Sequence, residues 1–272
     1  MNIDINFTNK ISRASKINKS YLCVGLDPEF DRLPDVFKNK EKPFLEFNKC
    51  IINLTADLVC AYKPQIAHYS ALSKEEELLE TIRFIKSTYP EIPVILDAKR
   101  GDIGSTARHY AVECFDRYGA DAVTLNPYLG FDAIEPFLEW KGKGLIILCK
   151  TSNPGSSMLQ DLKCPNKELY LEVARQVDSW QDKGDFLLVV GATYPDIMKQ
   201  IREIAKNTWF LVPGIGAQGG DLHSVVSSGR NSDFGLIISS SRGIIHKTKG
   251  SDFEQVVRAE ALSIRDQINQ LL

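Results

Sequence analysis

The stretch between residues 95 and 106 holds the charged residues whose types and spacing best suit catalysis. Asp97 and Lys99 follow a short apolar run, and Asp102 comes three residues after Lys99. In an extended chain Asp97 and Lys99 point to the same side, because side chains alternate with a period of two. Two carboxylates beside one ammonium group can keep the lysine charged and directed at one point. The simpler alternative is an ion pair at the end of a strand, with Asp102 as the N-cap of a helix over 105–118.

Composition limits the class of protein that positions these residues. The chain has 272 residues, of which 43% are hydrophobic, and can bury one large core. The net charge of -2 argues against a nucleic-acid or membrane-surface protein, so an anionic substrate needs locally placed cations. The six cysteines and four histidines show no spacing typical of a metal site. Without a signal peptide or a membrane-length apolar run, these features predict a reduced, cytoplasmic chain.

Short apolar runs alternate with amphipathic segments along the chain. They predict eight strands, at 21–26, 58–64, 94–96, 122–125, 145–149, 186–190, 209–212 and 235–238. Pro43 opens a helix with one apolar face, and Ser73 with Glu76 and Ser251 with Glu254 predict capping boxes of two later helices. Eight strands separated by helices indicate an α/β fold, a (β/α)8 TIM barrel built as a single domain over residues 1–272. A doubly wound sheet is the alternative, but it usually has fewer strands.

Polar residues follow the predicted strands. In an eight-stranded α/β barrel the carboxyl ends of the strands share one mouth, where the active site lies. The residues that would meet at this mouth are Asp27, Lys63, Asp97, Lys99, Asn126, Ser152, Gln218 and Arg242. A single residue of this kind is usually a cap or a turn residue, and Asn126 is better explained as fixing the turn before Pro127. Eight of them at one end of the barrel favour an active site.

The loop 213–221 has four glycines within seven positions. Glycines allow backbone N–H groups to approach an anion closely. A glycine-rich loop is weak evidence alone, but this one follows the seventh strand, and Arg242 follows the eighth. That arrangement is typical of the phosphate sites of such barrels, and arginine can bind phosphate through two hydrogen bonds. A phosphorylated substrate is therefore expected.

Several motifs together resemble those of the orotidine 5'-phosphate decarboxylase family. They run in order from residue 25 to residue 243 and comprise Gly25-Leu-Asp27-Pro28, Tyr62-Lys63-Pro64, Asp97-x-Lys99-x-x-Asp102-Ile103-x-x-Thr106, Thr124-Leu-Asn-Pro-Tyr-Leu-Gly130, Thr151-Ser-Asn-Pro-Gly155, Pro213-Gly-Ile-Gly-Ala-Gln-Gly-Gly220 and Ser241-Arg242-Gly243. None of these motifs is specific alone, but the set is. The forms of the third and fifth motifs resemble the longer bacterial branch of the family.

The resemblance implies the last step of UMP synthesis, in which orotidine 5'-monophosphate loses carbon dioxide to give uridine 5'-monophosphate. It implies that no metal or other cofactor takes part. Lys63, Asp97, Lys99 and Asp102 would form a charged network around pyrimidine C6. Lys99 would stabilise the negative charge that develops at C6 and then donate a proton there. Asp97 would lie near the leaving carboxylate, while Lys63 and Asp102 would keep their neighbours charged and in position.

The resemblance also implies substrate contacts. The substrate-binding residues would be Asp27, Ile103, Thr106, Ser152, Gly216, Gln218, Gly219 and Arg242. Asp27 and Lys63 would meet the ribose, Ser152 or the adjacent Thr151 the pyrimidine, and the last four residues of the set the phosphate. Asp102 and Thr106 would reach the site of a neighbouring subunit, because family members are dimers with shared sites. The expected partners are thus the nucleotide and a second copy of the chain, not nucleic acid or a membrane.

Two other functions are compatible with a barrel of this kind. One is a magnesium-dependent decarboxylase or aldolase acting on keto-sugar phosphates, which resembles this chain in its Asp-x-Lys-x-x-Asp motif. Such enzymes need a carboxylate for the metal at the end of the second strand, where this chain has Lys63. The other is a non-catalytic nucleotide-binding barrel, which would not require a lysine between two carboxylates. Both are disfavoured by the same charged residues.

Overall fold

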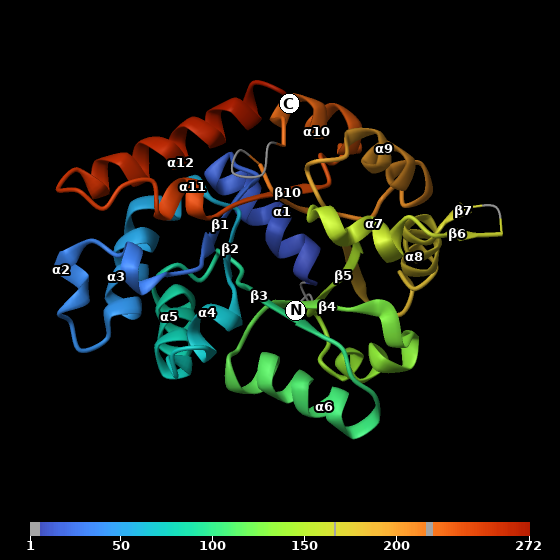
Figure 1. Cartoon of the computed structure of the whole chain (residues 1–272), viewed down its shortest axis with the longest axis horizontal. Helices are drawn as coiled ribbons and strands as arrows, with labels where there is room; N and C mark the ends of the chain where they lie inside the picture. Colours follow the sequence, from blue (N-terminus) through green and yellow to red (C-terminus); the bar gives the residue numbers. More distant parts are fainter. Residues whose placement is uncertain (1–5, 166, 216–219) are drawn as a thin grey trace, which may run out of the picture.

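Eight parallel strands form the centre of the molecule, and helices surround them (Figure 1). The computed structural model describes residues 6–165, 167–215 and 220–272. The strands are β1 (Leu22–Leu26), β2 (Ala61–Pro64), β3 (Ile95–Arg100), β4 (Ala122–Leu125), β5 (Gly144–Lys150), β8 (Asp185–Val190), β9 (Phe210–Pro213) and β10 (Leu236–Ser240). Their order is β2-β1-β10-β9-β8-β5-β4-β3, and single bridges between Tyr62 and Val94 and between Gln65 and Asp97 join the two edges. The predicted (β/α)8 barrel is confirmed.

The helices lie outside this ring, apart from the first. They are α1 (Phe7–Asn18), α2 (Asp35–Lys38), α3 (Pro43–Thr55), α4 (Ile66–Ser70), α5 (Glu75–Thr88), α6 (Gly104–Val112), α7 (Ser157–Gln160), α8 (Leu169–Asp178), α9 (Pro195–Ile204), α10 (Leu222–Gly229), α11 (Arg242–Ile245) and α12 (Phe253–Asn269). A two-stranded hairpin, β6 (Lys163–Cys164) and β7 (Lys167–Glu168), projects beside α8 (Figure 1). Between β4 and β5 the chain forms short 3₁₀ turns over 127–139 instead of an α-helix.

Helix α1 closes one end of the barrel, and Figure 1 shows it crossing the middle of the ring of strands. Phe7 and Ile11 on its inner face are fully buried against residues that fill the barrel interior. These interior residues include Cys23, Ala61, Ile95, Ala122, Ile146, Leu187, Leu211 and Ile237. A Cβ at Gly144 would lie 2.4 Å from a ring atom of Phe7, so the glycine makes room for this plug. With one end sealed, substrate access is left to the carboxyl ends of the strands.

Four details of the predicted elements are wrong. Strand β3 does not end at residue 96 but continues to Arg100, and β2 begins at Ala61 because residues 56–58 form a 3₁₀ turn. Ser73 does not cap α5: its φ of 53° is left-handed, whereas an N-cap needs extended backbone. Ser251 does not cap α12: the residue before this helix is Asp252, whose backbone is not extended and whose side chain makes no capping hydrogen bond. The helix predicted over 105–118 is confirmed as α6 followed by a π-helical turn at Glu113–Arg117.

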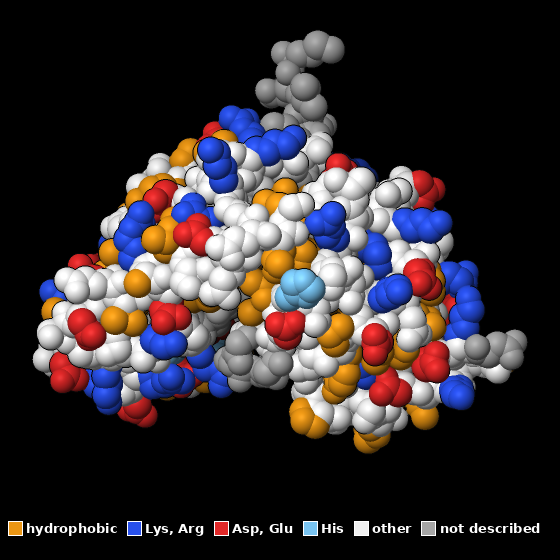
Figure 2. All heavy atoms as spheres, turned by 90° about the horizontal axis from the view of Figure 1, so that it is seen from above, with side chains coloured by type: hydrophobic (Ala, Val, Ile, Leu, Met, Phe, Trp, Pro, Cys, Tyr) orange, Lys and Arg blue, Asp and Glu red, His pale blue; other side chains and the backbone are white. Residues whose placement is uncertain are grey.

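The surface carries charges of both signs. On the face in Figure 2, lysine and arginine side chains alternate with aspartate and glutamate, with no broad area of one sign on that face. None of the described helices is long and apolar enough to cross a membrane. The six cysteines all carry free thiols.

Candidate active site

A buried carboxylate at the mouth of the barrel forms the centre of the candidate site. Asp97, the third residue of β3, is 8% exposed. Its Oδ2 atom accepts a hydrogen bond from Lys63 Nζ at 2.9 Å, and its Oδ1 atom accepts one from Lys99 Nζ at 2.6 Å. Lys63 is buried at the end of β2, whereas the Lys99 side chain is about half-exposed. The structure therefore brings together three of the four predicted catalytic residues.

Thr124 of β4 supports this cluster, and its role was not predicted. Its hydroxyl donates to Asp97 Oδ1 at 2.9 Å and accepts from the backbone N–H groups of Ala98 and Lys99 at 3.0 and 2.9 Å. Those N–H groups lie where the β3–β4 ladder is irregular, between Leu96 and Arg100, so the side chain replaces missing ladder bonds. Lys99 itself has a φ of 45°, a left-handed conformation that costs energy in a non-glycine residue. Thr124 thus fixes both the carboxylate and the backbone that carries the lysine.

The electrostatics of the cluster keep its buried members charged. Burial alone would raise the pKa of Asp97, but the ammonium groups of Lys63 and Lys99 outweigh it and hold that pKa below the usual carboxyl range. Burial alone would lower the pKa of Lys63, but the carboxylates of Asp97 and Asp27 reverse the effect and raise it above the usual lysine value. Neither group changes its protonation near neutral pH, so the cluster presents a permanent arrangement of charges.

A cavity of about 530 Å³ lies beside the cluster. Lys63, Asp97, Lys99 and Thr124 form one wall. The opposite wall comes from the segment 151–160, which follows β5, and the floor is apolar, with Leu148, Val189 and Leu211 from three strands. An apolar cavity with a few charged groups at one side suits a planar, partly polar ring such as a pyrimidine.

A second, smaller cavity adjoins the first through Lys63. It is lined by Asp27, Pro213, Gly214, Ile215, Ser239, Ser240, Ser241 and Arg242 as well as Lys63. Asp27 follows β1 and accepts a hydrogen bond from Gln65 N, while Arg242 begins α11 directly after β10. Among the described residues, Arg242 has no hydrogen bond or ion pair that would hold its guanidinium away from an anion. The predicted phosphate residues Gly216, Gln218 and Gly219 lie outside the described residues, between Ile215 and Gly220.

Asp102 does not join the cluster within one chain. Its Oδ1 atom accepts a hydrogen bond from the next residue, Ile103 N, at 2.8 Å, and Asp102 lines none of the described mouth cavities. The alternative role of Asp102 as a helix cap is wrong, because α6 begins at Gly104 and its N-cap residue is Ile103. Ile103 is 56% exposed, and Thr106 is exposed on α6. None of these three residues lines the described mouth cavities of its own chain.

Two adjacent residues after β5 carry hydroxyl groups. Thr151 is held inside its loop: its N–H donates to Gln160 Oε1, and its hydroxyl donates to Asn153 Oδ1 and accepts from Gln160 Nε2. Both Thr151 and Ser152 line the cavity. Asn126, in contrast, accepts a hydrogen bond from Tyr128 N and fixes the turn that contains Pro127, as expected.

The remaining polar residues do not form a second reactive cluster. Within the described ranges, no three His, Cys, Asp or Glu side chains gather where they could hold a metal ion. His246 is stacked on Phe47, and burial lowers its pKa; its Nε2 atom contacts the backbone at Asp27 and Glu29. His68 contacts the carbonyl oxygen of Pro28. Both histidines stiffen the loop after β1.

Comparison with known proteins agrees with this geometry. A model of the "Orotidine 5'-phosphate decarboxylase / HUMPS family" matches residues 20–254. Orotidine 5'-phosphate decarboxylase from Cellvibrio japonicus is 54% identical over 269 residues, which cover 97% of this chain and 98% of that protein. The same-named protein from Ralstonia pickettii is 48% identical over 268 residues, 98% of this chain and 99% of that one. The structure of Leishmania donovani OMP decarboxylase superposes with a TM-score of 0.84 at 35% identity, covering 98% of this chain and 99% of that chain. This chain belongs to the orotidine 5'-phosphate decarboxylase / HUMPS family.

Proposed function

We propose that this chain decarboxylates orotidine 5'-monophosphate to uridine 5'-monophosphate in de novo pyrimidine biosynthesis. It is a carboxy-lyase that uses no cofactor. Family membership supports the reaction, and one observation carries the proposal for this chain. Asp97 is a buried carboxylate held by an ammonium group at each oxygen, and it lines a cavity of about 530 Å³.

The chemical problem is the electron pair that is left behind. The bond between C6 and the carboxylate carbon breaks, carbon dioxide leaves, and both electrons stay at C6, where the ring stabilises them poorly. Enzymes typically lower barriers by roughly 8–23 kcal/mol, and here charged groups must supply that difference. Preorganised charges suit the task because they need no reorientation as the charge develops.

Lys99 is the proposed proton donor. Its ammonium group is bound to Asp97 Oδ1 at 2.6 Å and also lines the cavity, so it can attract the developing charge at C6. One N–H bond of Lys99 breaks and a C6–H bond forms, which leaves UMP and a neutral amine that solvent protonates again. Asp97 stays ionised near the departing carboxylate and disfavours that group relative to neutral carbon dioxide. Lys63 compensates the charge of Asp97 from the buried side.

Substrate binding is proposed to use the two adjoining cavities. The pyrimidine would occupy the larger cavity, with Ser152 or the adjacent Thr151 at its polar edge. Lys63 lines both cavities and Asp27 lines the smaller one, where the ribose hydroxyls would lie. Arg242 and the backbone of the 214–220 loop, with Gln218, Gly216 and Gly219, would hold the phosphate.

We also propose that two copies of the chain share their sites. Asp102, Ile103 and Thr106 line none of the described mouth cavities of their own chain, so we assign their contacts to the substrate and the lysine of a neighbouring copy. The exposed apolar side chains of Ile103, Tyr128 and Leu129 lie on the loops after β3 and β4, where such a copy would pack.

Mixing two inactive variants tests the shared site. In a shared dimer, Asp102→Ala and Lys99→Ala subunits combine into one site with both defects and one intact site. Random exchange makes about half of the dimers mixed, so about a quarter of wild-type activity should return in an isologous dimer. Activity that stays absent after demonstrated subunit exchange would remove Asp102 from the partner's site.

A spectrophotometric assay with orotidine 5'-monophosphate in excess EDTA tests the reaction itself. The pyrimidine absorbance should change at the same rate with and without EDTA. The competing function, a magnesium-dependent keto-sugar-phosphate decarboxylase or aldolase, would need a metal ligand at the end of β2, where the buried cation Lys63 would repel the metal. Activity that EDTA abolishes would favour that alternative, and nucleotide binding without any turnover would favour a non-catalytic barrel.

The proposal treats residues 1–272 as one decarboxylase domain. Six free thiols suit a reducing compartment, so we place the reaction in the cytoplasm.

A further inference from the structure

A second buried lysine lies outside the catalytic cluster. Lys150 is the last residue of β5 and is 1% exposed. Its Nζ atom is 2.5 Å from Asp161 Oδ1 and 3.2 Å from Ser156 Oγ. The same ammonium group lies over the rings of Tyr194 and Tyr170, 5.0 and 5.8 Å from their centroids. These four partners together surround the single positive charge of Lys150.

An irregularity in β5 gives Lys150 this direction. The alternation of side chains places Ile146 and Leu148 toward the barrel interior and would place Lys150 there too. The pairing of β5 with β8 shifts between Leu148 and Lys150, so one extra residue is accommodated in β5. A bulge of this kind turns the following side chain to the other face of the strand. Lys150 consequently points under the segment 151–161 and does not enter the cavity.

The segment 151–161 is the wall of the larger cavity that faces the catalytic cluster. Ser152, Asn153, Ser156 and Gln160 line the cavity from it, whereas the described lining residues do not include Lys150. Apolar packing holds this segment weakly, since Met158 is 82% exposed and Leu159 is also exposed. Polar contacts hold the segment instead. Hydrogen bonds join Thr151 near its start to Gln160 near its end, and the Lys150 ammonium group binds Ser156 in its middle and Asp161 at its end.

We propose that Lys150 and Asp161 are positioning residues that hold the 151–161 segment over the base of the substrate and so set affinity for the pyrimidine. The proposal rests on the proposed function, because it assumes that the nucleotide base enters this cavity. Lys150 acts through the segment and touches neither the substrate nor the reacting atoms. The phosphate contacts lie on other loops, after β9 and β10, and should not depend on it.

The test compares a ligand that has a base with one that lacks it. Affinities for UMP and ribose 5-phosphate are measured by calorimetry for the wild type, Lys150→Met and Asp161→Asn. The affinity for UMP divided by the affinity for ribose 5-phosphate measures what the pyrimidine base contributes to binding. We expect Lys150→Met to reduce this ratio roughly 10- to 100-fold, as a small misplacement of a binding wall can do, with ribose 5-phosphate affinity unchanged. Asp161→Asn keeps an oxygen acceptor for Lys150 and should reduce the ratio less.

Lys143→Met is the matched control. Lys143 precedes the other end of the same strand, is half-buried, and donates to Ala120 O at 2.6 Å. It should leave the ratio unchanged. The Asp161→Asn variant can decide the matter alone, because Asp161 has a side chain that is 38% exposed and lies outside the core.

Two results would overturn the inference: wild-type ratios in both Lys150→Met and Asp161→Asn, or an equal loss of affinity for both ligands. The turnover assay of the wild type is a separate measurement. A chain that binds UMP with a Lys150-dependent ratio but does not decarboxylate orotidine 5'-monophosphate would contradict the proposed function and leave the positioning role intact.

Discussion

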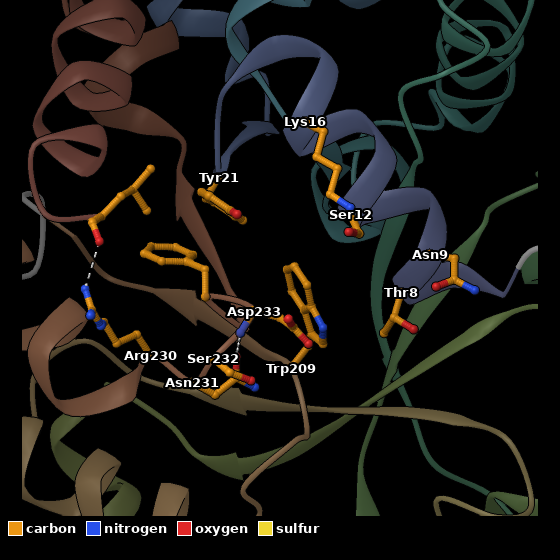
Figure 3. A pocket seen from close by; sticks show the side chains of 12 residues that line it. Thr8, Asn9, Ser12, Lys16, Tyr21, Trp209, Arg230, Asn231, Ser232 and Asp233 are labelled. Carbon is orange, nitrogen blue, oxygen red and sulfur yellow. Dashed lines mark hydrogen bonds between the residues drawn. The ribbon is translucent and has the colours of Figure 1, made fainter.

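The two ends of the barrel carry cavities of almost equal size but of different chemistry. The mouth cavity measures about 530 Å³, and a cavity beside α1 at the closed end measures about 510 Å³. The latter, which we call the base cavity, is shown in Figure 3; its lining includes Lys16, Tyr21, Trp209, Arg230 and Phe234. Size therefore does not identify the site.

The charges separate the two cavities. In the base cavity, Lys16 and Arg230 are exposed to water, and Arg230 is used to bind the carbonyl oxygens of Leu271 and Leu272. Burial raises the pKa of Tyr21 there, so its phenol becomes less acidic. At the mouth, neighbouring charges overcome burial and keep Asp97 and Lys63 ionised. Buried groups that are forced to stay charged against an open cavity are the mark of a reactive site.

The largest expected effect at the mouth comes from Lys99→Ala. Turnover should fall by at least roughly 10⁴-fold, because a proton donor and the nearest cation at C6 are removed together. UMP should still bind, since its phosphate contacts lie on other loops. Steady-state kinetics and calorimetry check both parts, and near-normal turnover in this variant would end the proton-donor assignment.

Arg242→Ala should have the next largest effect. Loss of the guanidinium leaves the phosphate dianion partly unpaired, which costs roughly 2–5 kcal/mol for a hydrogen-bonded charge pair. Both kcat/KM and the affinity for UMP should fall, while the pyrimidine cavity stays intact. If substrate is handled as well as by the wild type, the phosphate must be bound by another cation.

Thr124→Val tests the support of the cluster with a nearly isosteric change. Three hydrogen bonds to the Thr124 hydroxyl are lost, so stability should fall by roughly 1–3 kcal/mol. Because Asp97 and Lys99 lose a common anchor, kcat should also fall roughly 10- to 100-fold. The control is Thr55→Val, a buried hydroxyl bonded to Ile51 O and Tyr62 outside the site. It should lower stability but not kcat, and equal kcat values in the two variants would contradict the role of Thr124.

The smallest effect is expected in the base cavity. Lys16→Ala removes one of its exposed cations and should leave kcat and KM within about two-fold of wild type, because surface charges contribute little. Thermal unfolding should shift little as well. A large loss of turnover would show that the base cavity contributes to catalysis.

Most of the barrel could be predicted from the sequence, because its strands are short apolar runs bounded by prolines, glycines and charged residues. Strand β3 was predicted too short, since Asp97, Lys99 and Arg100 resemble the end of a strand. The strand continues beyond Leu96 because the Thr124 hydroxyl accepts the N–H groups of Ala98 and Lys99 in place of ladder hydrogen bonds. Nothing in the sequence distinguishes Thr124 from an ordinary β-branched strand residue.

The candidate site was predictable for residues that follow strands and not for those that depend on irregular backbone. Lys63 and Asp97 meet as the strand order requires. The direction of the Lys150 side chain depends on the shift in the pairing of β5 with β8, and no residue type in the sequence predicts that shift. Asp102 was expected, from the family resemblance, to reach the site of a neighbouring subunit. Within its own chain it lines none of the described mouth cavities, and spacing along the sequence cannot show which copy's site a side chain enters.

The most direct test of the central claim is a crystal structure of the chain with UMP. The account predicts the nucleotide in the mouth cavity, its phosphate at Arg242 and its pyrimidine C6 roughly 3–3.5 Å from Lys99 Nζ, the distance from which a proton can be delivered. A nucleotide in the base cavity, or one in the mouth with C6 out of reach of Lys99, would contradict it.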